Sequence, residues 1–133
     1  DLDLYKTLNG FDKKAFEQYT SVYSGILQNN DPVSTWTTKV QKTKAGGGYH
    51  QWHCENGQFL YRDRVLAWMV YLNTVPSQSG GGTDFLHQKL TLQPEAGTIV
   101  LWPASYTHVH RGGFLTGDIE KYIATGWFIR QPT

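Results

Sequence analysis

Near the N-terminus, apolar residues recur at steps of three and four, which is the spacing of one face of an α-helix. These residues are Phe16, Tyr19, Tyr23, Ile26 and Leu27. The pattern predicts a helix from Asp12 to Leu27, with Asp12 as the N-cap because its carboxylate can accept hydrogen bonds from the first turn. The sequence Asn-Asn-Asp-Pro at 29–32 is expected to break the chain after this helix.

Beyond Pro32 the pattern changes to short segments rich in β-branched and aromatic residues, separated by Gly, Pro and Asn. The predicted strands cover residues 35–40, 49–55, 65–72, 83–85, 89–92, 98–102, 107–111 and 121–129. Many short strands punctuated in this way are typical of a sandwich or jelly roll. We find no internal repeat or linker, so we expect one domain over residues 1–133, mainly β, with a supporting N-terminal helix.

Composition excludes several classes of protein. A chain of 133 residues with 14% aromatic residues suits one domain with a single core, not a disordered polymer. The formal net charge of +1 argues against a dedicated nucleic-acid-binding surface. No apolar run approaches the ~20 residues of a membrane span, so no membrane insertion is expected.

The single cysteine, Cys54, excludes an intrachain disulfide and fits a reducing compartment. We find no signal peptide and therefore expect a cytoplasmic location. The chain opens Asp-Leu-Asp without a methionine, as expected of a fragment or a processed product. Nothing in the pattern indicates an oligomeric state.

Three residues offer ligands for a divalent metal ion. His53 and Glu55 are separated by one residue, so on a strand their side chains point to the same side while Cys54 points away. His110, from a later strand, is expected to supply the third ligand. Two histidines and one carboxylate on one face of an octahedral ion leave positions open, and non-haem Fe(II) oxygenases use these positions for a co-substrate and O2.

A second set of residues indicates a pocket for an anion. One face of the last predicted strand consists of Lys121, Ile123, Thr125 and Trp127. A lysine is rarely buried beside apolar residues unless it is paired, so an anionic ligand inside the barrel would account for Lys121. Tyr71 is expected to place its hydroxyl in the same cavity. A metal, a phenol and an ammonium group together describe a site for a dicarboxylate.

Several short motifs follow one another between about Tyr49 and Phe128. They are His53-Cys-Glu55, Arg64-Val-Leu with Tyr71-Leu-Asn73, Gly81-Gly-Thr-Asp-Phe85, Gly97-Thr-Ile-Val-Leu-Trp-Pro103, and His110-Arg-Gly with Lys121-Tyr-Ile and Trp127. In this order and spacing the chain resembles the 2-oxoglutarate- and Fe(II)-dependent dioxygenases, specifically the prolyl 4-hydroxylase-like branch.

The resemblance implies a double-stranded β-helix, which is a jelly roll, and an oxygenase that converts 2-oxoglutarate and O2 to succinate and CO2 while it hydroxylates a C–H bond. His53, Glu55 and His110 would hold Fe(II) and form the catalytic centre. The distal carboxylate of 2-oxoglutarate would meet Lys121 and the Tyr71 hydroxyl. We expect Thr125, on the same face as Lys121, to contact this co-substrate as well.

Two positions depart from the pattern of the family. The carboxylate is Glu55, where aspartate is commoner, so the strand must lie slightly further from the metal. The distal histidine also has an alternative, because His108 faces the same side as His110 on a regular strand. The spacing from Trp102 favours His108, whereas the spacing to Lys121 and the His-Arg-Gly string favour His110. We expect His110 to be the ligand and His108 to lie in its outer shell or face the substrate.

The substrate is expected to be a peptidyl residue, with proline suggested by the resemblance, or a small molecule. Trp127 and Arg64 are the residues expected to contact it. Two alternatives remain open from the sequence. The first is a cupin-like metalloenzyme that needs no 2-oxo acid and in which Lys121 is structural. The second is a non-catalytic jelly roll that binds a ligand, and it would show neither iron binding nor turnover.

Overall fold

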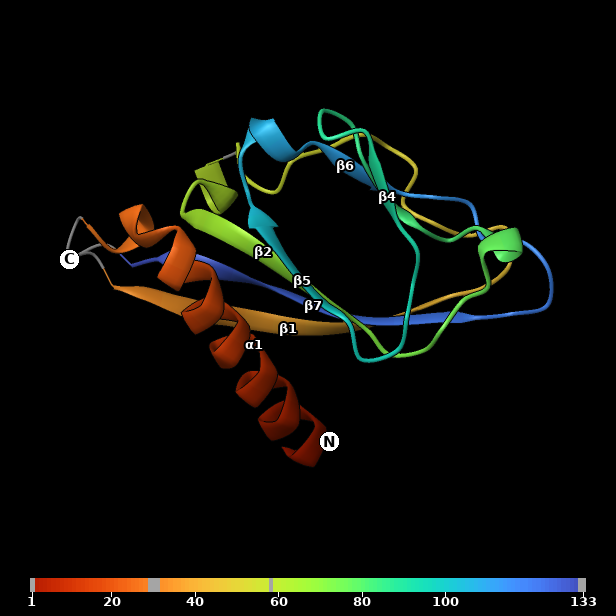
Figure 1. The fold of residues 1–133 in the computed structure, drawn as a ribbon, viewed down its shortest axis with the longest axis horizontal. Coiled ribbons are helices and arrows are strands. Elements are labelled where there is room, and N and C mark those ends of the chain that lie inside the picture. Colours follow the sequence, from red (N-terminus) through yellow and green to blue (C-terminus); the bar gives the residue numbers. More distant parts are fainter. Residues whose placement is uncertain (1, 29–31, 58, 132–133) are drawn as a thin grey trace.

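The chain forms one long helix followed by seven strands in the computed structural model, which describes residues 2–28, 32–57 and 59–131 (Figure 1). The elements are α1 (Leu2–Val22), β1 (Val33–Thr43), β2 (Arg64–Tyr71), β3 (Thr83–Phe85), β4 (Leu90–Leu92), β5 (Ile99–Pro103), β6 (His110–Gly112) and β7 (Lys121–Arg130). Single turns of 3-10 helix lie at Ser24–Leu27, Phe59–Tyr61, Ser77–Ser79 and Tyr106–His108. The expected fold class, mainly β with an N-terminal helix, is confirmed.

The strands form two antiparallel sheets that lie on opposite sides of the barrel (Figure 1). The larger sheet has the order β1-β7-β2-β5, and the smaller sheet has the order β4-β3-β6. The arrangement is the jelly roll that the many short strands predicted. None of the helices in the described part of the chain combines the length and apolar character needed to cross a membrane.

Strand β2 is apolar from Val65 to Tyr71 because both of its faces are covered. Leu66, Trp68 and Val70 point to the outer face of the larger sheet, where Leu8 of α1 packs against them. Ala67, Met69 and Tyr71 point to the inner face, together with Phe85, Trp102 and Trp127. The helix therefore closes one face of the sheet and leaves the other face free to line a site.

Gly126 of β7 lies where Trp68 and the backbone of β1 leave no space for a side chain. A Cβ at this position would lie 2.7 Å from two ring atoms of Trp68 and closer still to the carbonyl oxygen of Thr37. Trp68 is 0% exposed and cannot move aside. Glycine is required here because the indole and the backbone of β1 occupy the space of a side chain.

Three local expectations were wrong. The helix begins at Leu2 instead of Asp12, and Asp12 is not an N-cap but lies buried within α1, where its Oδ2 accepts a hydrogen bond from the Thr35 hydroxyl at 3.2 Å. Residues 49–55 form no continuous strand, and only His53 bridges to a neighbour. The expected strand at 107–111 is partly a 3-10 turn, so the regular alternation assumed for its histidines fails. Of the break expected at 29–32, residues 29–31 lie outside the described part.

Candidate active site

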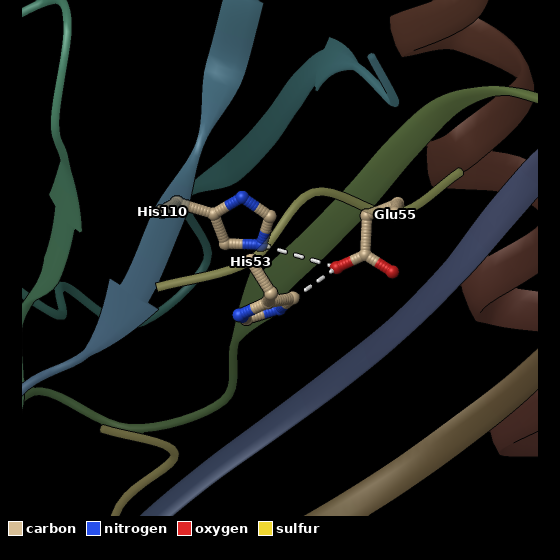
Figure 2. A group of neighbouring side chains, drawn as sticks. All are labelled: His53, Glu55 and His110. Carbon is tan, nitrogen blue, oxygen red and sulfur yellow. Dashed lines mark hydrogen bonds and ion pairs between the residues drawn. The ribbon is translucent and has the colours of Figure 1, made fainter. Parts of the chain in front are cut away.

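The two histidines of the predicted metal site are brought together by the backbone. His53 and His110 form a two-way bridge, with the amide of each donating to the carbonyl of the other at 3.0 and 2.9 Å. The backbone amide of Glu55 donates to the Ala104 carbonyl at 2.9 Å, and this hydrogen bond fixes the backbone that carries the carboxylate. Figure 2 shows the three side chains converging on one point from two distant segments.

The ligand atoms of these side chains lie within 4.8 Å of one another. The Nε2 atoms of His110 and His53 lie 3.1 and 3.3 Å from the same carboxylate oxygen, Oε1 of Glu55 (Figure 2). His110 is buried and the other two residues are half-buried. The group therefore faces the interior of the barrel on one side and is reachable on the other.

The remaining nitrogen of each imidazole is occupied. Nδ1 of His53 lies 2.9 Å from the Gln51 carbonyl, and Nδ1 of His110 lies 2.9 Å from the His108 carbonyl. A carbonyl accepts only, so Nδ1 carries the proton in each ring and Nε2 of the neutral ring is a bare lone pair. Two lone pairs and a carboxylate oxygen that face one another need a cation between them. This donor set fits a divalent transition metal held through Nε2, Nε2 and Oε1.

Glu55 is ionised in this environment. Burial by itself raises the pKa of a carboxyl group, but hydrogen bonds from His110, His53 and Trp127 outweigh it and hold the pKa of Glu55 well below its usual range. The two imidazoles make these hydrogen bonds from Nε2 only while they are protonated, and a metal ion would take the place of those protons. A permanently charged carboxylate at the centre of the group is what a metal ligand requires.

The second oxygen of Glu55 has partners of its own. Oε2 accepts a hydrogen bond from the Trp127 indole at 2.7 Å and lies 3.4 Å from a terminal nitrogen of Arg64. The guanidinium of Arg64 stacks over the rings of Trp127 and Tyr61, with its central carbon 3.8 and 4.1 Å from the ring centroids. Sequence reasoning had assigned Arg64 and Trp127 to the substrate and had not found these contacts, because no local pattern connects either residue to Glu55.

A cavity of about 1020 Å³ opens beside the three ligands. The inner face of β7 lines it with Lys121, Ile123, Thr125 and Trp127, which is the row expected from the alternation of this strand. Trp127 lies at Glu55, and Lys121 lies six residues further along the strand, roughly 20 Å away between Cα atoms. The cavity therefore runs from the candidate metal site toward the ammonium group.

Lys121 has the environment that the sequence suggested. Its side chain is 7% exposed, Nζ donates to the Gly81 carbonyl at 2.6 Å, and the ring of Tyr71 faces it at 5.7 Å. Within the described residues no carboxylate lies at ion-pair distance from Nζ. Burial lowers the pKa of Lys121 to about 8. The ammonium group is thus desolvated and has no anionic partner among the described residues.

Other predicted site residues lie close to this row. The Tyr71 hydroxyl is buried and is bonded to the Thr83 hydroxyl at 2.8 Å, so Thr83, not Tyr71, lines the cavity. Thr125 lines it too, although its hydroxyl donates to the Trp68 carbonyl at 2.7 Å. His108 is not part of the ligand group; its Nδ1 contacts the Thr107 hydroxyl at 2.9 Å.

Comparison with known proteins agrees with this geometry. A model of the 2OG-Fe(II) oxygenase superfamily matches residues 38–129. No curated protein matches the chain significantly. The solved structures that resemble it include a viral collagen prolyl hydroxylase from Paramecium Bursaria Chlorella virus-1 in complex with 2OG. That structure is 22% identical with a TM-score of 0.72, and the match covers 90% of this chain and 71% of the other.

Two further structures share the fold. A Pseudomonas putida prolyl-4-hydroxylase is 24% identical with a TM-score of 0.58, over 71% of this chain and 52% of the other. A Trichoplax adhaerens prolyl hydroxylase, in complex with a peptide fragment of the hypoxia inducible factor oxygen degradation domain, is 18% identical with a TM-score of 0.66, over 87% and 56%. The cofactors expected from the sequence, Fe(II) and 2-oxoglutarate with O2, are those of the matching family. This chain belongs to the 2OG-Fe(II) oxygenase superfamily.

Proposed function

We propose that this chain is an Fe(II)- and 2-oxoglutarate-dependent hydroxylase that acts on a peptide. The observation that carries the proposal is the convergence of two imidazole nitrogens and one ionised carboxylate in a cavity. The wall of this cavity also holds a buried ammonium group that has no anionic partner among the described residues. These are the two halves of a site for a metal-chelated dicarboxylate.

His53, Glu55 and His110 would hold Fe(II). The bound iron supplies an oxidant made from O2, which places one oxygen atom in a substrate C–H bond and the other in succinate as 2-oxoglutarate loses CO2. The residues of the chain orient the reactants. The carbonyl partners of both Nδ1 atoms keep the imidazoles turned toward the ion, and the apolar inner face of the sheet excludes water.

Lys121 would pair with the distal carboxylate of 2-oxoglutarate. Thr83 and Thr125, whose hydroxyls are already positioned by hydrogen bonds, line the space beside it. Tyr71 would act by holding the Thr83 hydroxyl and by placing its ring against the ammonium group. Folding has already removed the Lys121 ammonium group from water. Binding of the carboxylate would therefore not have to desolvate this ammonium group again.

A peptide substrate is favoured by the opening of the cavity. Tyr49 and Tyr61 line it and remain well exposed, and Arg111 stacks over the exposed ring of Trp52 at 4.3 Å. Exposed aromatic rings around a polar site are typical of surfaces that bind peptides. The fold shared with prolyl hydroxylases makes a prolyl residue the first target to test.

The test is succinate formation from 2-oxoglutarate by the iron-loaded protein, with a panel of proline-containing peptides and matched alanine peptides. We expect one mole of succinate for each mole of peptide that gains one oxygen atom, with the oxygen gain measured by mass spectrometry. His110→Ala is the matched negative control, and His87→Ala is an exposed histidine variant that should behave as the unaltered protein does. Iron binding with no 2-oxoglutarate turnover would point to a cupin-like enzyme, and no iron binding to a non-catalytic jelly roll.

A further inference from the structure

We infer that Trp127 is a positioning residue for the metal-binding carboxylate. Its indole N–H, assisted by Arg64, holds one oxygen of Glu55 so that only the other oxygen is offered to the ion between His53 and His110. The inference rests on the proposed function, because it takes Glu55 to be a metal ligand. It assigns Trp127 and Arg64 to the metal site, where the sequence had suggested the substrate.

The two oxygens of Glu55 have separate sets of partners. Oε1 lies 3.1 Å from Nε2 of His110 and 3.3 Å from Nε2 of His53. Oε2 lies 2.7 Å from Nε1 of Trp127 and 3.4 Å from Arg64. Indole and guanidinium groups only donate hydrogen bonds, so neither can compete for the metal ion, and each binds the oxygen that the ion does not use. The carboxylate is therefore presented through one oxygen.

Both donors are held in place by the fold. Trp127 is 6% exposed and lies in the middle of the larger sheet, paired with Trp36 of β1 and Ala67 of β2. Arg64 is buried against the Trp127 ring, and its terminal nitrogen also reaches the Glu55 carbonyl at 3.2 Å. The donors thus stand in position before a ligand arrives, which lowers the entropy lost when the carboxylate is ordered.

The arrangement accounts for glutamate at position 55. Glutamate has one more rotatable bond than aspartate, so an unsupported glutamate could turn either oxygen, or both, toward the ion. The hydrogen bond from Trp127 removes that freedom. An aspartate at the same backbone position would be shorter by one methylene and would not span the indole and the ion together. The contribution of Trp127 should therefore depend on the identity of the residue at position 55.

The experiment compares metal binding by two tryptophan variants under anaerobic conditions. Trp127→Phe removes the donor to Glu55. Trp102→Phe is the matched control, because Trp102 is 5% exposed, lines the same cavity and packs on His110 at 5.0 Å, whereas its Nε1 has no hydrogen-bond partner among the described residues. We expect Trp127→Phe to weaken Fe(II) binding about 10- to 100-fold, as is usual for the partners of metal ligands, and Trp102→Phe to weaken it clearly less.

Two further measurements separate positioning from packing. The visible absorption bands of bound Co(II) should change in Trp127→Phe, because the carboxylate can then rotate, and should change clearly less in Trp102→Phe. In Glu55→Asp, adding Trp127→Phe should cause little further loss of Fe(II) affinity. If the phenylalanine variant does not fold, replacement of Trp127 alone by benzothienylalanine removes the N–H and keeps the shape.

The outcomes distinguish this inference from the proposed function. Failure of the unaltered protein to bind Fe(II) would overturn both. The positioning role alone would be overturned if the unaltered protein binds Fe(II) normally and Trp127→Phe and Trp102→Phe cause equal losses. It would also be overturned if Trp127→Phe causes the same loss with Glu55 in place as it does in the Glu55→Asp variant. A loss that is specific to Trp127 and requires Glu55 supports it.

Discussion

The substitution Lys121→Met separates a ligand-binding role from a structural one. Methionine has nearly the length of lysine but carries no charge, so it should fill the same space among the apolar groups of the inner sheet face. In the ligand-free protein the Lys121 ammonium has a carbonyl and a ring as neighbours, and burial lowers its pKa to about 8 from the usual 10.5. The charged form is therefore held at a cost.

The lowered pKa of Lys121 changes the free energy of folding with pH. Between pH 8 and 10.5 the unfolded chain binds a proton at this lysine that the folded chain has lost, so folding becomes more favourable as the pH rises through this window. Below pH 8 the whole penalty is present, and the difference in pKa corresponds to roughly 3 kcal/mol. Lys121→Met removes it and leaves the Gly81 carbonyl without a donor, which costs about 1–3 kcal/mol. We expect the ligand-free variant to be as stable as the unaltered protein or more stable.

Binding of the co-substrate should change in the opposite direction. In the variant the distal carboxylate of 2-oxoglutarate would enter a buried position without a counter-charge, and breaking a buried pair from one side costs about 3–5 kcal/mol. At 1.4 kcal/mol per tenfold, the dissociation constant should rise by roughly two to three and a half orders of magnitude.

The assay is calorimetric titration of the Mn(II)-loaded protein with 2-oxoglutarate, together with urea unfolding of the ligand-free protein. Lys14→Met, which removes an exposed lysine of α1, controls for the change in net charge and should bind normally. Unchanged affinity in Lys121→Met would refute the assignment of this lysine. A loss of affinity that merely follows a loss of stability would make Lys121 structural, as a cupin-like enzyme requires.

Three other outcomes are expected. Affinity for 2-oxoglutarate should level off as the pH falls toward 7 and should fall about tenfold per pH unit above 8, as Lys121 loses its proton, and Lys121→Arg should remove this dependence; a fall above pH 8 that persists in the arginine variant would contradict it. His53→Ala should lose bound iron by atomic emission while His87→Ala retains it, and full iron content in the first would exclude His53 as a ligand. Gly126→Ala should destabilise the fold by about 1–3 kcal/mol in urea, whereas Gly10→Ala, in open space on α1, should not; equal stability of the two would disprove the crowding at Gly126.

Local pattern was enough for β7, the strand whose inner face lines the cavity. The alternation along β7 assigned Lys121, Ile123 and Thr125 to one face, and the structure places them on the inner face. Side-chain alternation is a property of the extended backbone itself, so it needs no knowledge of distant neighbours. Local pattern failed at the start of α1. Aspartate is a residue type that often caps helices, but the carboxylate of Asp12 accepts a hydrogen bond from Thr35, a residue 23 positions away.

The sequence by itself determined which chemical groups are present: two imidazoles, one carboxylate and one lysine on an apolar strand face, in an order that resembles one family. Only the tertiary structure decided how they meet. A two-way backbone bridge pairs His53 with His110, and a 3-10 turn directs His108 elsewhere. The indole of Trp127 meets a carboxylate 72 residues away. Contacts of this kind depend on how separate strands register across the barrel, and that register is set by the packing of the whole core, not by any local run of residues.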